Sequence, residues 1–332
     1  MSSARSLILA ALLSTTACTA HAEVKAVASI KPVHSLVAAV MEGVGEPGLI
    51  VDGAGSPHTY ALKPSQAQML ENADVVFWVG HELEAFLEKP LETIGAKATA
   101  VELLDSHGLK KLGFREGGAF EKHEDSDDHD DDDHKAEAEH DHDDEETAEA
   151  EHEHEHEHGE FDTHVWLDPE NAKAMVHEIE EALVKADPEN AAKYEANAEA
   201  VSARLDALIA EVSAELDPVK DKPFIVFHDA YQYFENRFGV TAAGSITVSP
   251  EVMPGAERVG EIRAKVQELS AACVFSEPQF EPKLVSTITE GTQAKSGVLD
   301  PLGAALDDGP SLYFEVIRNM ANALKSCLSQ AS

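Results

Sequence analysis

The sequence predicts an α/β protein with two α/β lobes of mainly parallel sheets, joined by a single long linker helix. Three observations carry this prediction. Strand-like and helix-like segments alternate over residues 24–94 and again over 224–330, which is the signature of parallel α/β sheets. Residues 74–80, DVVFWVG, are almost continuously apolar, as expected of a strand covered on both faces. Between the two regions lies a long Ala-rich segment without Gly or Pro interruption, typical of one extended helix.

The first lobe is predicted to contain four strands, because four apolar runs are separated by helical or turn segments. The predicted strands cover residues 24–30, 47–54, 74–80 and 161–169, and the predicted helices cover 31–43, 63–73, 81–94 and 170–186. Pro64 suits the first turn of its helix.

The long helix is predicted from about residue 188 to 216, which is about 29 residues or roughly 43 Å. A coiled-coil dimer is the alternative, but the large apolar side chains cover only its last third, so we expect a spine between lobes and a monomeric chain. The second lobe is predicted to contain strands over 224–230, 240–246 and 272–278, helices over 231–239, 255–269 and 282–292, a further segment over 295–303 and a final helix over 311–330.

The N-terminus predicts export. Arg5, a short apolar run over 7–13 and the pattern Ala20-His21-Ala22 are typical of a secretory signal peptide cleaved before Glu23. The run is too short to span a bilayer. A lipoprotein anchored at Cys18 is the alternative, but its usual upstream leucine is lacking. We therefore divide the chain into a signal peptide (1–22), an N-terminal lobe (23–187), the linker helix (188–217) and a C-terminal lobe (218–332).

Cleavage leaves two cysteines, Cys273 and Cys327. An even pair in an oxidising compartment favours a disulfide. Metal ligation by thiolates is the alternative, although neither cysteine has the close partner that such sites usually show.

The charge is concentrated in one segment. The net charge is −38, and residues 121–160 hold 22 acidic residues against Lys122 and Lys135, a net of −20 that leaves about −18 for the rest. An acidic chain argues against nucleic acid or anionic lipid as a partner. The segment has almost no large apolar residue, so a loop without regular secondary structure is expected over about 117–160.

This loop also holds nine histidines, which suit accessory metal binding: His123, His129, His134, His140, His142, His152, His154, His156 and His158. A loop without fixed geometry should bind each ion weakly, but it can raise the local metal concentration as a scavenger. A sensor that partly orders when zinc is plentiful is a second expectation for the same loop. A solvated acidic loop with no binding role is the alternative.

Three histidines outside the loop are candidate metal ligands. His58 and His228 follow predicted strands, and His164 lies beside one. Loops at the carboxyl ends of parallel strands converge where such sheets bind ligands, and neutral imidazole is a common ligand of Zn²⁺. Each histidine alone could equally be solvated or hydrogen-bonded.

Other polar residues have weaker assignments. Asp300, at a strand end in the second lobe, is a possible fourth ligand, with water as the alternative. Asp229 could orient an imidazole or cap a helix. The remaining histidines of the mature chain are interpreted as helix-surface, cap or turn residues: His34, His81, His107 and His177.

Six motifs, in this order, resemble those of one family. They are SPHTYALKPS, THVWLDP, VFHDAYQYFE, PGAERVGEIR, CVFSEPQF and GVLDPLG, and they span residues 56–303. Together with the His- and Asp-rich insertion before THVWLDP, they are similar to the periplasmic zinc-binding component of ABC importers, the ZnuA family, over about residues 24–328.

The resemblance implies two α/β lobes with little hinge motion and a buried metal between them. Carried over by position, it implies that His58, His164 and His228 bind Zn²⁺. Manganese-binding relatives have an acidic residue where His228 stands, so the resemblance favours zinc. Some zinc members have a Glu before the first ligand, where this chain has Pro57; Asp300 or solvent is then expected as fourth ligand. A disulfide matching Cys273–Cys327 also occurs in zinc members.

The sequence therefore predicts a periplasmic solute-binding protein, not an enzyme, that delivers Zn²⁺ to a membrane permease. A zinc hydrolase or hydratase is the first alternative, because three histidines and water also describe catalytic zinc. No HExxH pair and no evident general base accompany the ligands. A metal buffer or adhesin, in which the acidic loop does the main binding, is the second alternative.

Overall fold

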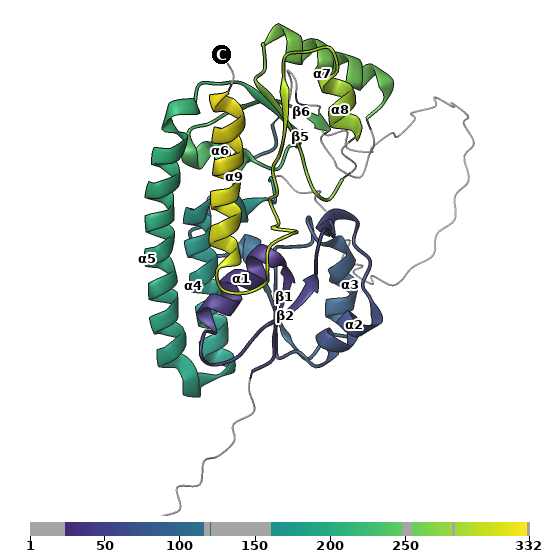
Figure 1. The fold of residues 1–332 in the computed structure, drawn as a ribbon. Helices are drawn as coiled ribbons and strands as arrows, with labels where there is room; N and C mark the ends of the chain where they lie inside the picture. The colour runs from purple at the N-terminus through teal and green to yellow at the C-terminus, as the bar shows by residue number, and fades with distance from the viewer. Residues whose placement is uncertain (1–23, 116–119, 121–160, 248–253, 281–282, 331–332) are drawn as a thin grey trace, which may run out of the picture.

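The computed structural model describes residues 24–115, 120, 161–247, 254–280 and 283–330. This part of the chain forms two lobes, each built on a four-stranded sheet whose strand pairs are all parallel (Figure 1). The predicted fold class is confirmed. Within the described residues, no helix has the length and apolar character needed to cross a bilayer.

The first sheet has the order β2-β1-β3-β4. Its strands are β1 (Ala26–Ile30), β2 (Gly48–Val51), β3 (Val75–Trp78) and β4 (Thr99–Glu102), and its helices are α1 (Lys31–Val40), α2 (Pro64–Glu71) and α3 (Ala85–Thr93). The central strands β1 and β3 are buried at every position. This explains their almost continuous apolar sequence, because helices cover both faces of such a sheet.

The second sheet repeats the same pattern with the order β6-β5-β7-β8. Its strands are β5 (Phe224–His228), β6 (Ala242–Thr247), β7 (Cys273–Ser276) and β8 (Lys295–Val298), and its helices are α6 (Gln232–Phe238), α7 (Ala256–Glu268) and α8 (Lys283–Thr289). Helices α7 and α8 cover one face, where a small separate apolar cluster forms around Ile225 and Ile262.

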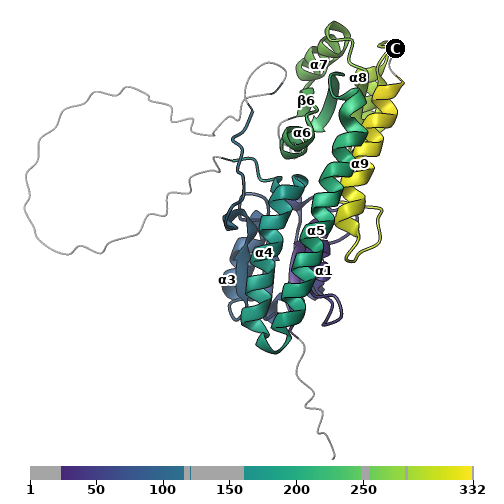
Figure 2. The same ribbon diagram turned by 90° about the vertical axis from the view of Figure 1, so that its left-hand side faces the viewer.

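Two helices connect the lobes, α5 (Ala191–Leu216) and α9 (Leu312–Ser329), and α4 (Pro169–Ala186) packs against α5 on the first lobe. Figure 2 shows α5 and α9 side by side along the molecule, and both also contact α1. The predicted single helix from 188 is instead a 3-10 turn, Pro188–Asn190, followed by the 26 residues of α5; a further 3-10 turn, Asp217–Val219, ends it.

The predicted strand over 161–169 is wrong. Val165–Leu167 is a 3-10 turn, closed by the Leu167 N–H that donates to the His164 carbonyl at 3.1 Å. All three side chains are buried, so an apolar run of this length could not distinguish a strand from a buried turn. The fourth strand is β4, which the sequence did not reveal because its first two residues, Thr99 and Ala100, are exposed. A 3-10 turn, Leu103–Asp105, follows it.

One apolar core extends through both lobes. It contains Phe77 of the first sheet, Leu208 of α5, Phe224 of the second sheet and Tyr313 of α9, together with Trp166. Because the largest of these side chains are almost fully buried, any relative motion of the lobes would expose apolar surface or open cavities, at a cost of about 25 cal/mol per Å².

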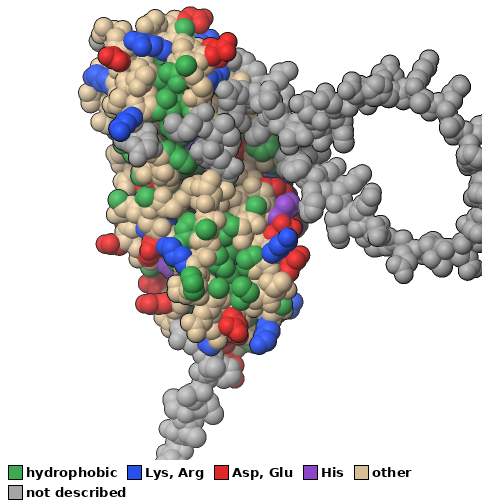
Figure 3. All heavy atoms as spheres, turned by 90° about the vertical axis from the view of Figure 1, so that its right-hand side faces the viewer, with side chains coloured by type: hydrophobic (Ala, Val, Ile, Leu, Met, Phe, Trp, Pro, Cys, Tyr) green, Lys and Arg blue, Asp and Glu red, His purple; other side chains and the backbone are tan. Residues whose placement is uncertain are grey.

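On the face shown in Figure 3, Lys and Arg side chains are interspersed with acidic ones rather than gathered in one basic patch.

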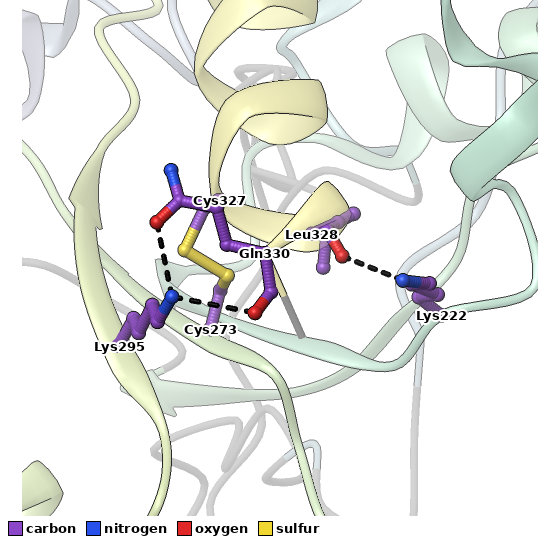
Figure 4. The surroundings of a disulfide bond; sticks show 6 residues. All are labelled: Lys222, Cys273, Lys295, Cys327, Leu328 and Gln330. Carbon is purple, nitrogen blue, oxygen red and sulfur yellow. Dashed lines mark hydrogen bonds between the residues drawn. A yellow bond between two sulfur atoms is a disulfide. The ribbon is translucent and has the colours of Figure 1, made fainter. Parts of the chain in front are cut away.

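A disulfide joins Cys273, at the start of β7, to Cys327 in α9 (Figure 4). Two lysines reach the same end of α9: Lys222 Nζ donates to the Leu328 carbonyl at 2.8 Å, and Lys295 Nζ donates to Gln330 Oε1 at 2.9 Å. Cations are favourable at a helix C-terminus, where the last carbonyls lack partners within the helix. The end of α9 is therefore fixed to the second sheet.

Reduction of this disulfide should lower the free energy of unfolding by about 2–4 kcal/mol, because the bond closes a long loop in the unfolded chain. The cysteines are 54 residues apart. Urea unfolding of the oxidised chain, the reduced chain and C273A/C327A would measure the loss. The reduced chain is the control for side-chain packing, and an unchanged midpoint on reduction would contradict the expectation.

Candidate metal centre

Three elements place the three predicted ligands. His58 lies in a 3-10 turn, Pro57–Thr59, that follows β2 and begins with a proline, whose fixed φ suits this position. His164 directly precedes the 3-10 turn that leads into α4. His228 is the last residue of β5 in the second sheet. The first two histidines therefore come from the first lobe and the third from the second lobe.

The structure brings these three side chains together. The ring centroids are 5.1 Å apart for His164 and His228, and 5.4 and 5.8 Å from His58 to each of them. One nitrogen from each ring lies within 4.8 Å of the other two. The Nε2 atoms of His164 and His228 are 3.3 Å apart, close to the separation of about 3.4 Å expected for two nitrogens bonded tetrahedrally to one zinc ion.

Buried carboxylates fix the tautomers of two rings. Asp162 Oδ1 lies 2.7 Å from Nδ1 of His164, and Glu277 Oε1 lies 2.7 Å from Nδ1 of His228. Each carboxylate accepts a hydrogen bond, so each Nδ1 carries the proton and each Nε2 keeps its lone pair in the neutral ring. When both rings are neutral, these two lone pairs face each other and repel, and either a metal ion between them or an extra proton on His228 removes the repulsion. Such carboxylate–imidazole pairs are usual around bound metals.

The sequence did not reveal these two carboxylates. Asp229, considered as the residue that orients a histidine, instead forms an ion pair with Arg115. Glu277 follows β7, the strand next to β5, so the rule that strand ends converge could have found it. Asp162 lies two residues before His164, where its carboxylate also accepts the backbone N–H of His164 at 3.0 Å.

Asp300 does not join the three histidines in this structure. Its two oxygens accept N–H groups from the turn that follows it: Leu302 at 3.2 Å, Gly303 at 2.9 Å and Ala304 at 2.7 Å. Gln279 Nε2 donates to it as well, at 3.1 Å. With four donors on its carboxylate, Asp300 stabilises the turn that carries Pro301 and Leu302.

The histidines surround a small cavity of about 10 Å³, enough for about one water-sized particle. Besides the three histidines, the cavity wall is largely apolar and includes Pro57, Trp166, Phe280, Pro301 and Leu302. The Trp166 indole N–H donates to the Pro301 carbonyl at 2.9 Å, which joins a wall from the first lobe to a wall from the second. A space of this kind suits a single ion rather than an organic ligand.

The pKa values of two of these imidazoles shift in opposite directions. Burial lowers the pKa of His58 well below its ordinary value, and His164 and His228 lower it further. Burial also acts to lower the pKa of His228, but the carboxylate of Glu277 outweighs it and the pKa is raised. His58 is therefore neutral and ready to bind a cation, whereas His228 retains its extra proton to higher pH and must lose it when a metal binds.

The chain on both sides of the acidic insertion is fixed beside the site. The Asp162 N–H donates to the Leu112 carbonyl at 2.9 Å, and Gly113 and Phe161 form an isolated antiparallel bridge. The Tyr233 hydroxyl of α6 accepts the Leu112 N–H at 2.9 Å and donates to the Asp162 carbonyl at 2.7 Å. The chain on each side of the insertion is thus held against the second lobe through Tyr233, and on the C-terminal side this contact, at Asp162, is two residues before His164.

The other histidines have different surroundings. His34, expected at a helix surface, is buried, and its Nε2 lies 3.0 Å from the Pro47 carbonyl oxygen. His107 and His177 are exposed, as predicted, and His81 is exposed in the turn after β3. The nine accessory histidines lie outside the described residues.

The family model and the most similar curated relatives agree on one family. The family model for the periplasmic component A of zinc-uptake complexes, ZnuA, matches residues 26–327. The high-affinity zinc uptake system protein ZnuA of Brucella suis biovar 1 is 64% identical over 305 residues, which are 92% of this chain and 91% of the relative. The protein of the same description from Paracoccus denitrificans is 44% identical over 325 residues, 97% of this chain and 98% of the relative.

A solved structure described as the crystal structure of ZnuA has the same fold, with a TM-score of 0.69 at 24% sequence identity, over 91% of this chain and 100% of that chain. The match to the family model and the identity to the Brucella protein both cover nearly the whole chain. The chain therefore belongs to the ZnuA family of periplasmic zinc-uptake proteins.

Proposed function

We propose that this chain captures one Zn²⁺ ion with His58, His164 and His228 and delivers it to the membrane permease of an ABC zinc importer. One observation carries the proposal most: the Nε2 atoms of His164 and His228 lie 3.3 Å apart while carboxylates hold the protons on the opposite nitrogens. The names of the relatives, high-affinity zinc uptake system proteins, support it independently.

The donor set favours zinc. Three imidazoles offer nitrogen donors, which suit Zn²⁺ better than the oxygen-preferring Mg²⁺, Ca²⁺ or Mn²⁺. The nearby carboxylates of Asp162 and Glu277 are engaged by imidazole N–H groups. Water or a rearranged Asp300 would complete four-fold coordination.

A hydrolytic role has less support. Catalytic zinc needs an open coordination position beside a space for substrate, whereas this cavity is small, and its carboxylate, Glu277, is engaged by His228. The family comprises substrate-binding components of transport systems, not enzymes. Tight, reversible coordination is the only chemistry required.

The remaining assignments complete the proposal. Residues 1–22 are a signal peptide removed on export, and the mature chain works as a monomer in the periplasm. It consists of an N-terminal lobe (23–187), a linker helix (188–217) and a C-terminal lobe (218–332). The nine histidines and 22 acidic residues of the insertion scavenge Zn²⁺ near the cleft.

Removal of a ligand tests the proposal directly. H58A and H228A should each lower the zinc affinity of the tightest site by at least about 100-fold. Removal of a residue that only hydrogen-bonds to a metal ligand already lowers metal affinity by about 10–100-fold, and removal of the ligand itself should cost at least as much. Competition with a chromophoric zinc chelator measures the change. H177A, which removes an exposed histidine on α4, is the matched control. Unchanged affinity in both ligand variants would refute this assignment of the site.

The pH dependence should follow His228. Its pKa is raised by Glu277, so a proton competes with the metal as pH falls through that raised pKa, and zinc affinity decreases. E277Q removes the charge that holds this proton and also the partner that orients the ring. We expect E277Q to weaken zinc binding by about 10–100-fold at pH 8.

The difference between E277Q and the unchanged protein should then narrow as the pH is lowered, because proton competition at His228 is weaker in the variant. Affinities measured between pH 5.5 and pH 8 check this. A ratio that stays constant over this range would show that Glu277 orients the ring without influencing its protonation.

Deletion of residues 121–160 should leave one tight zinc ion per chain and remove several weaker ones, because the three proposed ligands all lie outside the deleted segment. Equilibrium dialysis over a range of free zinc concentrations separates the two classes. Loss of the tight site on deletion would instead place the main binding in the insertion.

A further inference from the structure

A second group of possible metal ligands lies beside strands β3 and β4, at the opposite end of the strand order from β2. It consists of His81 and Glu82, in the turn between β3 and α3, and Glu102, the last residue of β4. Strands β3 and β4 are adjacent and parallel, with Trp78 opposite Glu102. The turn and the strand end therefore meet at the carboxyl edge of the same sheet from which His58 emerges.

The turn that carries His81 is tightly organised. Glu84 is fully buried, and its Oε2 accepts the N–H groups of Val79 at 2.9 Å and Gly80 at 3.0 Å. The Glu84 N–H donates to the Gly80 carbonyl at 2.9 Å, and the Leu104 N–H donates to the Val79 carbonyl at 2.9 Å. The second bond links the turn to the end of β4, so the backbone positions of all three side chains are fixed.

Gly80 allows the carboxylates to approach. A Cβ atom at this position would lie 2.6 Å from Glu102 Oε1 and 3.2 Å from Glu82 Oε2. Any other residue would therefore push the Glu102 carboxylate away from the turn. The absence of a side chain leaves a space in which both oxygens lie near the imidazole of His81.

Both carboxylates face the same nitrogen. Nδ1 of His81 is 3.3 Å from Glu82 Oε2 and 3.5 Å from Glu102 Oε1. Ligand atoms bonded tetrahedrally to one zinc ion at about 2.0–2.2 Å lie about 3.3–3.6 Å from one another. Nδ1 therefore already lies at this spacing from both carboxylate oxygens, and all three donor atoms lie within 4.8 Å of one another.

The group carries excess negative charge. Among the described residues, neither Glu82 nor Glu102 forms an ion pair with lysine or arginine, and His81 is their only basic neighbour within 4 Å. Burial raises the pKa of Glu102, and the charge of Asp105 raises it further. A bound dication would offset this repulsion, whereas a singly protonated imidazole offsets only part of it.

His177 provides a useful contrast. It also lies near two glutamates, but Nδ1 faces Glu180 at 3.6 Å while Nε2 faces Glu181 at 3.5 Å. Its two neighbours lie on different sides of the ring and cannot share an ion with one nitrogen. An exposed histidine beside two acidic residues therefore does not by itself produce the convergence seen at His81.

We propose that His81, Glu82 and Glu102 form a second divalent-cation site, selective for Zn²⁺-like ions, at the carboxyl edge of the first sheet. The site holds its ion more weakly than the histidine centre because it has one imidazole and is half exposed, with 46% of the His81 side chain accessible. Both sites lie at the carboxyl edge of the first sheet. In the strand order, β1 separates β2, which leads to His58, from β3, which leads to His81, so these two strands are about 10 Å apart.

The test follows individual imidazole rings by NMR in the full-length mature chain during titration with ZnCl₂. Ring signals of His81 and His177 are identified by their loss in H81A and H177A. We expect the His81 signals to be unchanged during the first equivalent, which fills the tight site, and then to shift at a lower free zinc concentration than those of His177.

The carboxylate variants decide whether the site is built from all three residues. E82Q and E102Q should each raise the zinc midpoint of the His81 signals by about tenfold or more, with the His177 midpoint unchanged. E180Q is the matched control and should not affect His81. Equal midpoints for His81 and His177, or an E102Q midpoint equal to that of the unchanged protein, would overturn the second site.

The proposal does not depend on the histidine centre. A first equivalent that fails to bind tightly would contradict the proposed function, whereas an unresponsive His81 would contradict only the second site.

Discussion

The Nε2 atoms of His164 and His228 face each other across 3.3 Å, and each ring has its proton held on Nδ1 by a buried carboxylate. With both rings neutral the arrangement is costly, because two lone pairs are directed at one small volume, and a metal ion or an extra proton on His228 relieves that cost. The arrangement persists because each carboxylate is itself held in place: the Asp162 carbonyl accepts from the Tyr233 hydroxyl of α6, and Glu277 follows β7. The affinity of the site therefore depends on how firmly the two lobes hold these rings in place.

The lobes are held by a shared framework. Helices α5 and α9 run along both, one apolar core passes between them, and the disulfide fixes α9 to the second sheet. Such a framework limits the conformational entropy lost when the ion binds, since the ligands are already close to their bound positions. Proton uptake by His228, whose pKa is raised, is one route by which coordination could be weakened locally.

Much of this architecture could be predicted from the sequence. The apolar runs of β1, β3 and β5 identified buried parallel strands, and His58 and His228 could be placed at strand ends. The failures have physical causes. Val165–Leu167 is buried on all sides, so its pattern does not reveal whether it is strand or turn, and β4 is too exposed to show an apolar run. Asp162 and Glu277 were missed because carboxylates are common in an acidic chain, and only their buried contacts with imidazole Nδ1 distinguish them. Asp300 has the position expected of a ligand, but its oxygens are used by the following turn.

The bridge between Gly113 and Phe161, together with the bond from the Asp162 N–H to the Leu112 carbonyl, closes the base of the acidic insertion. The entropy of closing a loop grows only logarithmically with its length. Once the base is fixed, residues can be gained or lost in the insertion with little effect on Asp162 and hence on His164. Changes in the length and histidine content of the insertion are then expected to be nearly neutral for the three buried histidines. If the insertion scavenges zinc as proposed, its peripheral binding capacity can change by insertion or deletion alone, without compensating changes in the fold.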